Sequence, residues 1–289
     1  MEASRRIEQA LATSLQRCER IECPPRLQAA LRHAVFPAGA RVRPRLCLAV
    51  AHSCGDDDPG LADASAAALE LLHCASLVHD DLPCFDDAAT RRGRASVHRA
   101  FGERTAVLVG DALIVMAFEC IARAGARSPM RMAGVLSTLA RAAGAPNGLA
   151  AGQAWECEPQ AEVERYHRQK TGSLFAAATV AGAQCAGADP GRWRNFGECL
   201  GEAYQVADDI RDVADDPALL GKPVGQDSAH GCPSAVAALG LHGAVARFEE
   251  LLDGALRAIP TCPGETQLRA LVQFESIRLI PKGLAHRAA

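Results

Sequence analysis

A long apolar run restricts the folds that this 289-residue chain can adopt. Residues 62–82 are very rich in alanine and leucine, and the run becomes polar only at its end, where His79, Asp80 and Asp81 occur together. Alanine and leucine are strong helix formers, and the run lacks the alternation that a half-buried strand requires. We therefore expect a long buried helix with carboxylates at its end, which Pro83 ends or distorts.

The rest of the chain shows the same helical pattern. Further helices are expected at 3–22, 26–35, 44–53, 104–124, 130–143, 147–156, 172–187, 192–214, 232–239, 242–259 and 264–277. Residues 84–95 form a polar, arginine-rich loop in this interpretation, and no strand alternation, internal repeat or low-complexity linker is visible. The sequence predicts an all-α fold, a single large helical-bundle domain spanning residues 1–289.

The charge of the chain excludes one class of partner. A formal net charge of −3 gives no support for nucleic-acid binding. Any anionic ligand must therefore be held by local positive charge.

The twelve cysteines show no disulfide or zinc pattern. No CxxC pair is present, and several lie in apolar helical segments, namely Cys47, Cys74, Cys120 and Cys185. We expect them to be free thiols that fill space in the core, which indicates a reducing, cytoplasmic setting. No signal-type segment and no apolar run of membrane-spanning length is expected, so the prediction is a soluble protein without a membrane anchor.

An acidic cluster at residues 208–212 (DDIRD) has a simple geometry. Asp208 and Asp212 are four residues apart, so a helix places them on one face, about 6 Å apart along the axis. Like charges at this spacing destabilise a helix by roughly 0.2–0.5 kcal/mol. A cation would offset that repulsion, and a small set of carboxylate ligands suits Mg²⁺ bound jointly with phosphate.

A second acidic cluster lies at residues 80–86 (DDLPCFD). It has two additional residues before its last aspartate, and the helix break at Pro83 would return Asp86 toward Asp80. Helices that carry the two clusters would then face each other across a central cleft, with metal ions and a diphosphate between them.

Basic residues lie near the acidic clusters and near other expected helix boundaries. They are Arg43, Arg91, Arg92, Lys170 and Lys222. Guanidinium groups donate in a planar fork that matches phosphate oxygens. Solvated acidic helix ends are common, but two such clusters with basic residues downstream favour a magnesium–diphosphate ligand.

These motifs resemble those of the trans-prenyl diphosphate synthase family, from Gly39 to about residue 236. The order is the same: 80–86 with Arg91-Arg92-Gly93, then Gly152-Gln153, Lys170-Thr171-Gly172 and 208–212. Residues 36–44 (FPAGARVRP) and 221–227 (GKPVGQD) are most similar to bacterial carotenoid-pathway geranylgeranyl diphosphate synthases. The resemblance implies an isoprenoid-synthase type of helical bundle, a homodimer, and Mg²⁺-dependent condensation of isopentenyl diphosphate with dimethylallyl, geranyl or farnesyl diphosphate.

The resemblance also implies residue roles. Asp80, Asp86 and Asp208 would bind Mg²⁺, three ions with substrate bound, supported by Asp81 and Asp212. The allylic diphosphate would be bound by Arg91, Lys170 and Lys222. Isopentenyl diphosphate would be held by Arg43, His73 and Arg92. Catalytic roles beside the reacting carbons fall to Lys170, Thr171 and Gln205.

Two departures from the family pattern concern basic residues. Ala40 stands where the family usually has a lysine for isopentenyl diphosphate, and Cys232 stands where another basic residue is usual. Each loss removes a diphosphate contact worth about 1.5–3 kcal/mol if charge-assisted. Arg41 receives no role from the sequence.

Small side chains below the first acidic cluster bear on product length. Ala75 and Ser76 occupy positions where bulky aromatics shorten the product in this family, and Leu72 lies another turn down, about 12 Å from Asp80. The expected product is geranylgeranyl diphosphate, with twenty carbons. The opposing wall could include Val115, Met116 or Phe118.

Three alternatives compete with this interpretation. One is a farnesyl diphosphate synthase, and another is a non-catalytic subunit of a heteromeric prenyltransferase, which the two missing basic residues favour. The third is a class I terpene cyclase, which the low aromatic content of 4% opposes.

Overall fold

The computed structural model describes residues 2–19, 22–36, 39–155, 157–158, 168–214 and 234–280. Contacts between residues divide the chain into two compact units. The first comprises Met1–His52, Asp56–Leu139 and Ala181–Ala188, and the second comprises Ser53–Gly55, Ala140–Val180 and Asp189–Ala289.

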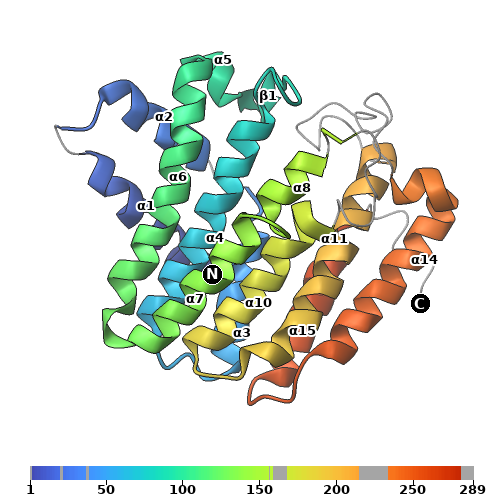
Figure 1. Ribbon diagram of the computed structural model, residues 1–289. Coiled ribbons are helices and arrows are strands. Elements are labelled where there is room, and N and C mark those ends of the chain that lie inside the picture. The colour runs from blue at the N-terminus through green and yellow to red at the C-terminus, as the bar shows by residue number, and fades with distance from the viewer. Residues whose placement is uncertain are drawn as a thin grey trace. The chain divides into compact units, whose positions relative to one another are not determined.

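The first unit is built from helices and one small hairpin (Figure 1). Its elements are α1 (Glu2–Gln16), η1 (Arg17–Glu19), α2 (Pro25–Val35), most of α3 (Val42–Ser53), α4 (Pro59–Asp80), β1 (Thr90–Arg91), β2 (Arg94–Ala95), α5 (Val97–Phe101), α6 (Glu103–Ala124), η2 (Gly125–Arg127) and most of α7 (Pro129–Ala143).

The second unit is helical in all its described segments. Its elements are α8 (Leu149–Trp155), the π-helix η3 (Arg168–Gly172), the first part of α10 (Ser173–Cys185), η4 (Pro190–Trp193), α11 (Arg194–Ala214), α14 (Ala235–Ala258) and α15 (Glu265–Ser276). The predicted all-α character is therefore observed, while the prediction of one domain over residues 1–289 stays a prediction.

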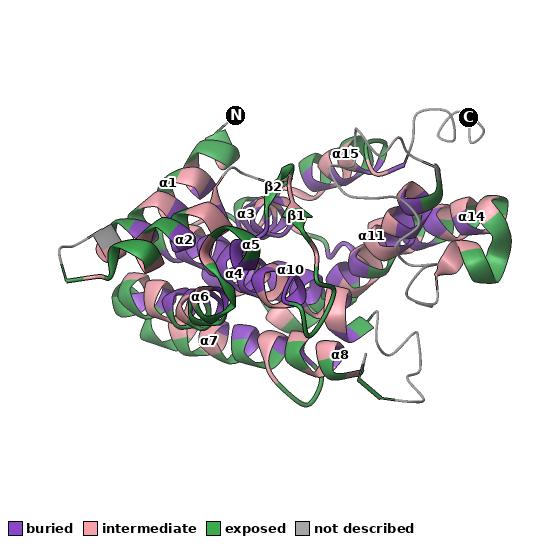
Figure 2. Ribbon diagram, turned by 90° about the horizontal axis from the view of Figure 1, so that it is seen from above, coloured by how far each residue is buried: buried purple, intermediate pink, exposed green. Residues whose placement is uncertain are grey.

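Helix α4 is the buried centre of the first unit, as its sequence predicted. It begins three residues before the predicted start because the Asp58 carboxylate accepts a hydrogen bond from the Leu61 amide at 3.2 Å and Pro59 occupies the first turn. Figure 2 shows most of α4 in the buried colour, with α6 beside it. Removing the alanine and leucine side chains of α4 from water stabilises the folded protein. The same packing fixes the position of the carboxylates at the end of the helix.

Two helical stretches meet the length and composition of a membrane span. They are Pro59–Asp80, where 72% of the apolar window is buried inside the protein, and Glu103–Arg127, where 39% is buried. Burial explains the apolar character of α4 as that of a core helix. The lower burial of the second stretch leaves an apolar face on α6.

The arginine-rich loop contains a β-hairpin that the sequence did not predict. Thr90 pairs with Ala95, and Arg91 pairs with Arg94. The turn residues Arg92 and Gly93 have φ angles of 53° and 72°. Positive φ at both central positions characterises the type I′ turn, whose twist matches that of the two strands.

Helices α11 and α14 pack together in the second unit. Their shared core includes Val206 and Ile210 from α11 and Phe248 and Leu251 from α14. Inside α14, Gly240 has a φ of 69°, so the element consists of two helical parts joined at a kink. The sequence predicted two helices with a break at this place.

The eleven described cysteines are all free. Cys47, Cys74 and Cys185 are buried, and burial raises the pKa of Cys74 and Cys185 to about 12. Protonated buried thiols of this kind act as apolar packing groups, in agreement with the sequence interpretation.

Candidate active site

The first acidic cluster forms a tight turn at the end of α4. The Asp86 amide donates to the Asp80 carbonyl at 2.9 Å, and the Leu82 carbonyl accepts from the amides of Phe85 and Asp87 at 2.9 and 3.1 Å. The turn returns Asp86 to the helix end, as the helix break predicted. Asp80 is buried, whereas Asp86 is exposed.

Asp81 forms an ion pair with Arg91. Its Oδ1 accepts from Nε of Arg91 at 3.0 Å and from Nη2 at 2.5 Å, and the carboxylate is almost fully buried. Burial raises the pKa of Asp81, while the hydrogen bonds from Arg91 oppose that shift. Asp81 thus orients the arginine that is predicted to bind the allylic diphosphate.

The hairpin turn places Arg92 against Gly39. A β-carbon at Gly39 would lie 2.8 Å from Cζ of Arg92, so a larger residue there would force this guanidinium to shift from its observed position. Nη1 of Arg92 is buried and has no hydrogen-bond partner among the described residues. This arginine therefore holds an N–H group without a protein acceptor, as expected for a group that binds a substrate anion.

His73 lies two turns before the end of α4 and is half-buried. Burial holds its pKa well below the ordinary value, and the positive charges of Arg43 and Arg92 add to the shift. The ring is therefore neutral near pH 7. Arg43 is on α3 and is 8% exposed, and it lies close enough for its charge to lower the pKa of His73.

The three predicted chain-length residues lie on α4. Leu72 and Ala75 are buried, and Ser76 is half-buried with its hydroxyl donating to the His73 carbonyl at 2.8 Å. On the neighbouring helix α6, Met116 is 8% exposed, whereas Val115 is 66% exposed. Phe118, the third wall candidate, is half-buried, so Met116 is the most buried of the three.

The second acidic cluster stands in the last turns of α11. Asp209 and Asp212 are 2% and 3% exposed, and Asp208 is half-buried. Oδ1 of Asp208 accepts from Nη2 of Arg211 at 2.9 Å. The three carboxylates therefore differ in surroundings although they share one helix end.

A chain of hydrogen bonds joins the π-helix to this cluster. The Thr171 hydroxyl donates to Oε1 of Gln205 at 2.8 Å, and Nε2 of Gln205 donates to Oδ1 of Asp209 at 3.0 Å. The other oxygen of Asp209 accepts from the Ala235 amide at 2.7 Å, at the start of α14. Asp209, to which the sequence interpretation gave no role, thus fixes Gln205; the four-residue spacing between Gln205 and Asp209 was the available signal.

Two glycines allow the π-helix to lie close to its neighbours. A β-carbon at Gly152 would lie 2.4 Å from the amide nitrogen of Lys170, and one at Gly201 would lie 2.8 Å from Cα of Gly172. Backbone contact at these distances requires glycine. The packing explains the glycine of the Gly152-Gln153 motif, and a π-helix segment is a frequent feature of functional sites.

Several of the residues that the sequence singled out lie outside the described residues, namely residues 37–38, residues 221–227 and Cys232. They include Lys222, predicted to bind the allylic diphosphate, and the position of Cys232, where a basic residue is missing. Ala40, the other departure, is exposed.

The carboxylates fit a magnesium ion. Oδ1 of Asp212 is buried and has no hydrogen-bond partner within the described segments. A buried charged oxygen without a donor is unfavourable, and a cation would offset that cost. In the described part of the chain, no three acidic, histidine or cysteine side chains form a metal cage by themselves. Mg²⁺ does not need one, because it keeps several waters and shares substrate phosphates.

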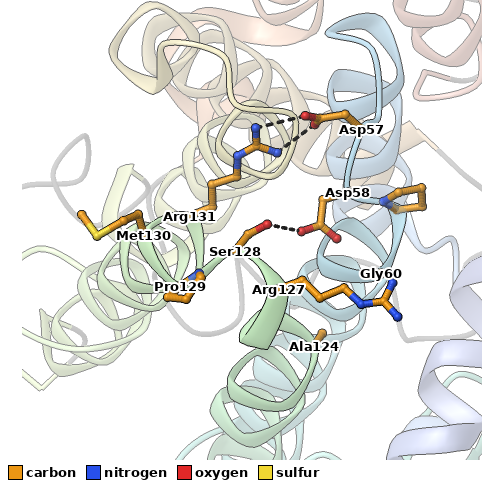
Figure 3. Close-up of a pocket in the computed structure, with 10 residues that line it drawn as sticks. Asp57, Asp58, Gly60, Ala124, Arg127, Ser128, Pro129, Met130 and Arg131 are labelled. Carbon is orange, nitrogen blue, oxygen red and sulfur yellow. Dashed lines mark hydrogen bonds and ion pairs between the residues drawn. The ribbon is translucent and has the colours of Figure 1, made fainter.

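A cavity of about 670 Å³ lies elsewhere in the first unit (Figure 3). It is at the start of α4, roughly 30 Å along the helix axis from Asp80. Arg131 pairs there with Asp57 at 2.8 Å, and the Ser128 hydroxyl donates to Asp58 at 2.7 Å. None of the predicted substrate residues lines it. Size alone therefore does not mark the substrate site.

A family model identifies the chain. The model for polyprenyl synthetase matches residues 24–268. The chain is a member of the polyprenyl synthetase family. This confirms the predicted family and, with it, the predicted fold class.

Two relatives of this polyprenyl synthetase match it over almost its whole length. It is 51% identical to geranylgeranyl diphosphate synthase of Cereibacter sphaeroides, over 99% of this chain and 100% of the relative, and 46% identical to that of Rhodobacter capsulatus, over 97% of each. Solved structures agree. The geranyltransferase of Helicobacter pylori, complexed with magnesium and isoprenyl diphosphate, has a TM-score of 0.83 and 29% identity, with 96% of each chain covered. The geranylgeranyl pyrophosphate synthetase of Pyrococcus horikoshii has a TM-score of 0.80 and 28% identity, covering 99% of this chain and 98% of that one. These relatives confirm the predicted prenyltransferase class.

Proposed function

We propose that this polyprenyl synthetase condenses isopentenyl diphosphate head-to-tail with an allylic diphosphate to make geranylgeranyl diphosphate. The observation that carries the proposal is the buried carboxylate oxygen of Asp212, which has no donor among the described residues and stands one turn from Asp208. The two relatives named geranylgeranyl diphosphate synthase support the product.

The proposed metal ligands are Asp80, Asp86 and Asp208, for three Mg²⁺ ions with substrate bound. Mg²⁺ would neutralise the charge that develops on the leaving diphosphate. Asp81 and Asp212 support these ligands, Asp81 by orienting Arg91.

The basic residues divide between two substrates. We assign Arg91, Lys170 and Lys222 to the allylic diphosphate. Arg43, His73 and Arg92 are assigned to isopentenyl diphosphate. Burial is the main cause of the lowered pKa of His73, and the charges of Arg43 and Arg92 lower that pKa further, so local positive charge near His73 supports an anion site in an acidic protein.

The reaction breaks one bond and forms another. The carbon–oxygen bond of the allylic diphosphate ionises to give an allylic cation and free diphosphate. The double bond of isopentenyl diphosphate attacks the cation, and the released diphosphate removes the proton. Thr171 and Gln205, held by their mutual hydrogen bond, would stabilise the cation with neutral oxygens that are too weakly nucleophilic to trap it.

The proposed product length rests on α4. Ala75 and Ser76 are small, so the chain can grow past them, and buried Leu72 would stop it one turn deeper. We place Met116 of α6 in the opposing wall, because it is buried on the helix that packs along α4.

We further propose a homodimer that works in the cytoplasm and supplies a carotenoid pathway. The exposed residues Val107, Leu108, Ile114 and Val115 support the dimer, since they recur at seven-residue spacing and form an apolar stripe on α6. The many free thiols favour a reducing compartment.

Product analysis tests the proposed function. Purified protein would be incubated with Mg²⁺, isopentenyl diphosphate and either dimethylallyl, geranyl or farnesyl diphosphate. A twenty-carbon diphosphate is the expected end product. A product that stops at fifteen carbons would instead indicate a farnesyl diphosphate synthase. Failure to elongate any starter, with activity restored by a partner synthase, would indicate a non-catalytic subunit.

A further inference from the structure

Arg41 is buried in a conformation that non-glycine residues rarely adopt. It is 6% exposed and has a φ of 50°. Its guanidinium donates from Nε to Glu8 at 2.9 Å, from Nη2 to the Val35 carbonyl at 2.9 Å, and from Nη1 to Glu70 at 2.6 Å. A left-handed backbone at such a residue persists only when the surrounding contacts hold it there.

Glu70 connects Arg41 to Arg92. It is 1% exposed in the middle of the apolar helix α4. Oε1 accepts from Arg41 at 2.6 Å and lies 3.5 Å from Nη2 of Arg92. The shorter contact belongs to Arg41, so Arg41 neutralises most of the carboxylate charge and the Arg92 contact is long and weak.

The sharing of Glu70 leaves Arg92 available for a ligand. Nη1 of Arg92 is buried without a partner among the described residues, and Gly39 gives its guanidinium space. A buried carboxylate that loses its cation is strongly unfavourable. Without Arg41, Glu70 would therefore attract the nearest remaining cation, which is Arg92.

We propose that Arg41 is a positioning residue for isopentenyl diphosphate, acting through Glu70 to keep Arg92 free for the substrate. This inference rests on the proposed role of Arg92 at that substrate. It also gives Arg41 a function in a chain that has Ala40 instead of a lysine beside it. Arg41 itself touches no substrate in this account.

The test is a double-mutant cycle on Arg41 and Glu70. In Arg41→Gln, the KM for isopentenyl diphosphate is expected to rise about tenfold, the effect of weakening one charge-assisted contact, with kcat and the KM for farnesyl diphosphate changed less than about threefold. Adding Glu70→Gln removes the competing charge, so the double variant should recover a KM within about threefold of wild type. A merely structural role of Arg41 predicts the opposite, because a second buried substitution would not restore the KM.

The controls separate positioning from stability. Arg6 also pairs with two carboxylates of the first unit, Asp56 at 2.8 Å and Asp63 at 2.7 Å, so Arg6→Gln should lower thermal stability without changing the KM. Arg41→Lys keeps a positive charge beside Glu70 and should keep a KM near that of wild type, which provides a variant if Arg41→Gln does not fold.

Calorimetric titration with isopentenyl diphosphate gives an independent readout. If wild-type protein shows no condensation, the proposed function fails, while binding still reports on positioning. A rise in Kd for Arg41→Gln that Glu70→Gln reverses supports the inference. An unchanged affinity in folded Arg41→Gln, or no recovery in the double variant, overturns it.

Discussion

Asp81 accepts two hydrogen bonds from Arg91 through a single carboxylate oxygen, at 3.0 and 2.5 Å. Its neighbour Asp80 precedes the turn that returns Asp86 to the helix end. The two adjacent aspartates of the first acidic cluster therefore have different surroundings. We assign metal binding to Asp80 and the orientation of an arginine to Asp81.

Replacement of Asp81 by asparagine tests this division. Asp81→Asn leaves an amide that cannot attract Arg91 by charge, so the KM for the allylic diphosphate should rise about tenfold, with kcat nearly unchanged. Asp87→Asn is the matched control, because Asp87 pairs with Arg99 on the exposed side of the turn. Steady-state kinetics of both variants would measure the KM for the allylic diphosphate. Equal KM values for Asp81→Asn and wild type would refute the orienting role of Asp81.

The close contact between Gly152 and Lys170 predicts sensitivity to one methyl group. In Gly152→Ala the new β-carbon would lie 2.4 Å from the Lys170 amide nitrogen, so the π-helix must shift, at a cost of about 1–3 kcal/mol of unfolding free energy. The activity should fall with it, since Lys170 and Thr171 move. Gly254→Ala in α14 has ordinary contact distances and should be neutral or stabilising by up to about 1 kcal/mol. Urea unfolding and initial rates would measure both, and a fully active Gly152→Ala protein would contradict the contact.

His73 predicts a pH dependence of stability. Its pKa in the folded protein lies well below the ordinary value, so below about pH 6.5 the unfolded chain binds a proton that the folded chain does not. Stability from this residue is fully present above that pH and is lost as pH falls, by at most about 1.4 kcal/mol per pH unit. Urea unfolding at pH 7.5 and 5.5 should show a smaller loss for His73→Gln than for wild type. The exposed His52 provides the control variant His52→Gln. An equal loss in His73→Gln and wild type would mean that His73 is not held neutral.

The apolar stripe on α6 predicts the surface of the proposed dimer. Leu108 and Val115 are 56% and 66% exposed, and Leu108→Asp should convert a dimer into a monomer because a charge would be buried at the interface. Met130 is 85% exposed outside the stripe, so Met130→Asp should leave the dimer intact. Sedimentation velocity distinguishes these outcomes, and a Leu108→Asp dimer would place the interface elsewhere.

Much of the fold follows from local pattern. The long helix at 62–82 was predicted within a few residues, because its apolar run, its breaker and its acidic end all lie in one stretch of sequence. The break inside α14 was also predicted, since glycine marks it. The return of Asp86 toward Asp80 followed from the helix break at Pro83.

The remaining features depend on contacts between distant residues. The Arg92-Gly93 turn was missed because strands of two residues give no alternation. The role of Arg41 was invisible because its partners, Glu8 and Glu70, lie 33 and 29 residues away. Glu70 offered one signal: a charged residue inside an apolar helix needs a buried partner.

Metal-dependent condensation is the central claim, and the initial rate of isopentenyl diphosphate incorporation into farnesyl diphosphate tests it most directly. The rate should require Mg²⁺, fall to background with EDTA, and drop by about a thousandfold or more in Asp208→Asn, through loss of electrostatic stabilisation of the leaving group. Circular dichroism would confirm that the variant is folded. A rate in EDTA equal to that in Mg²⁺, or full activity in Asp208→Asn, would contradict the account.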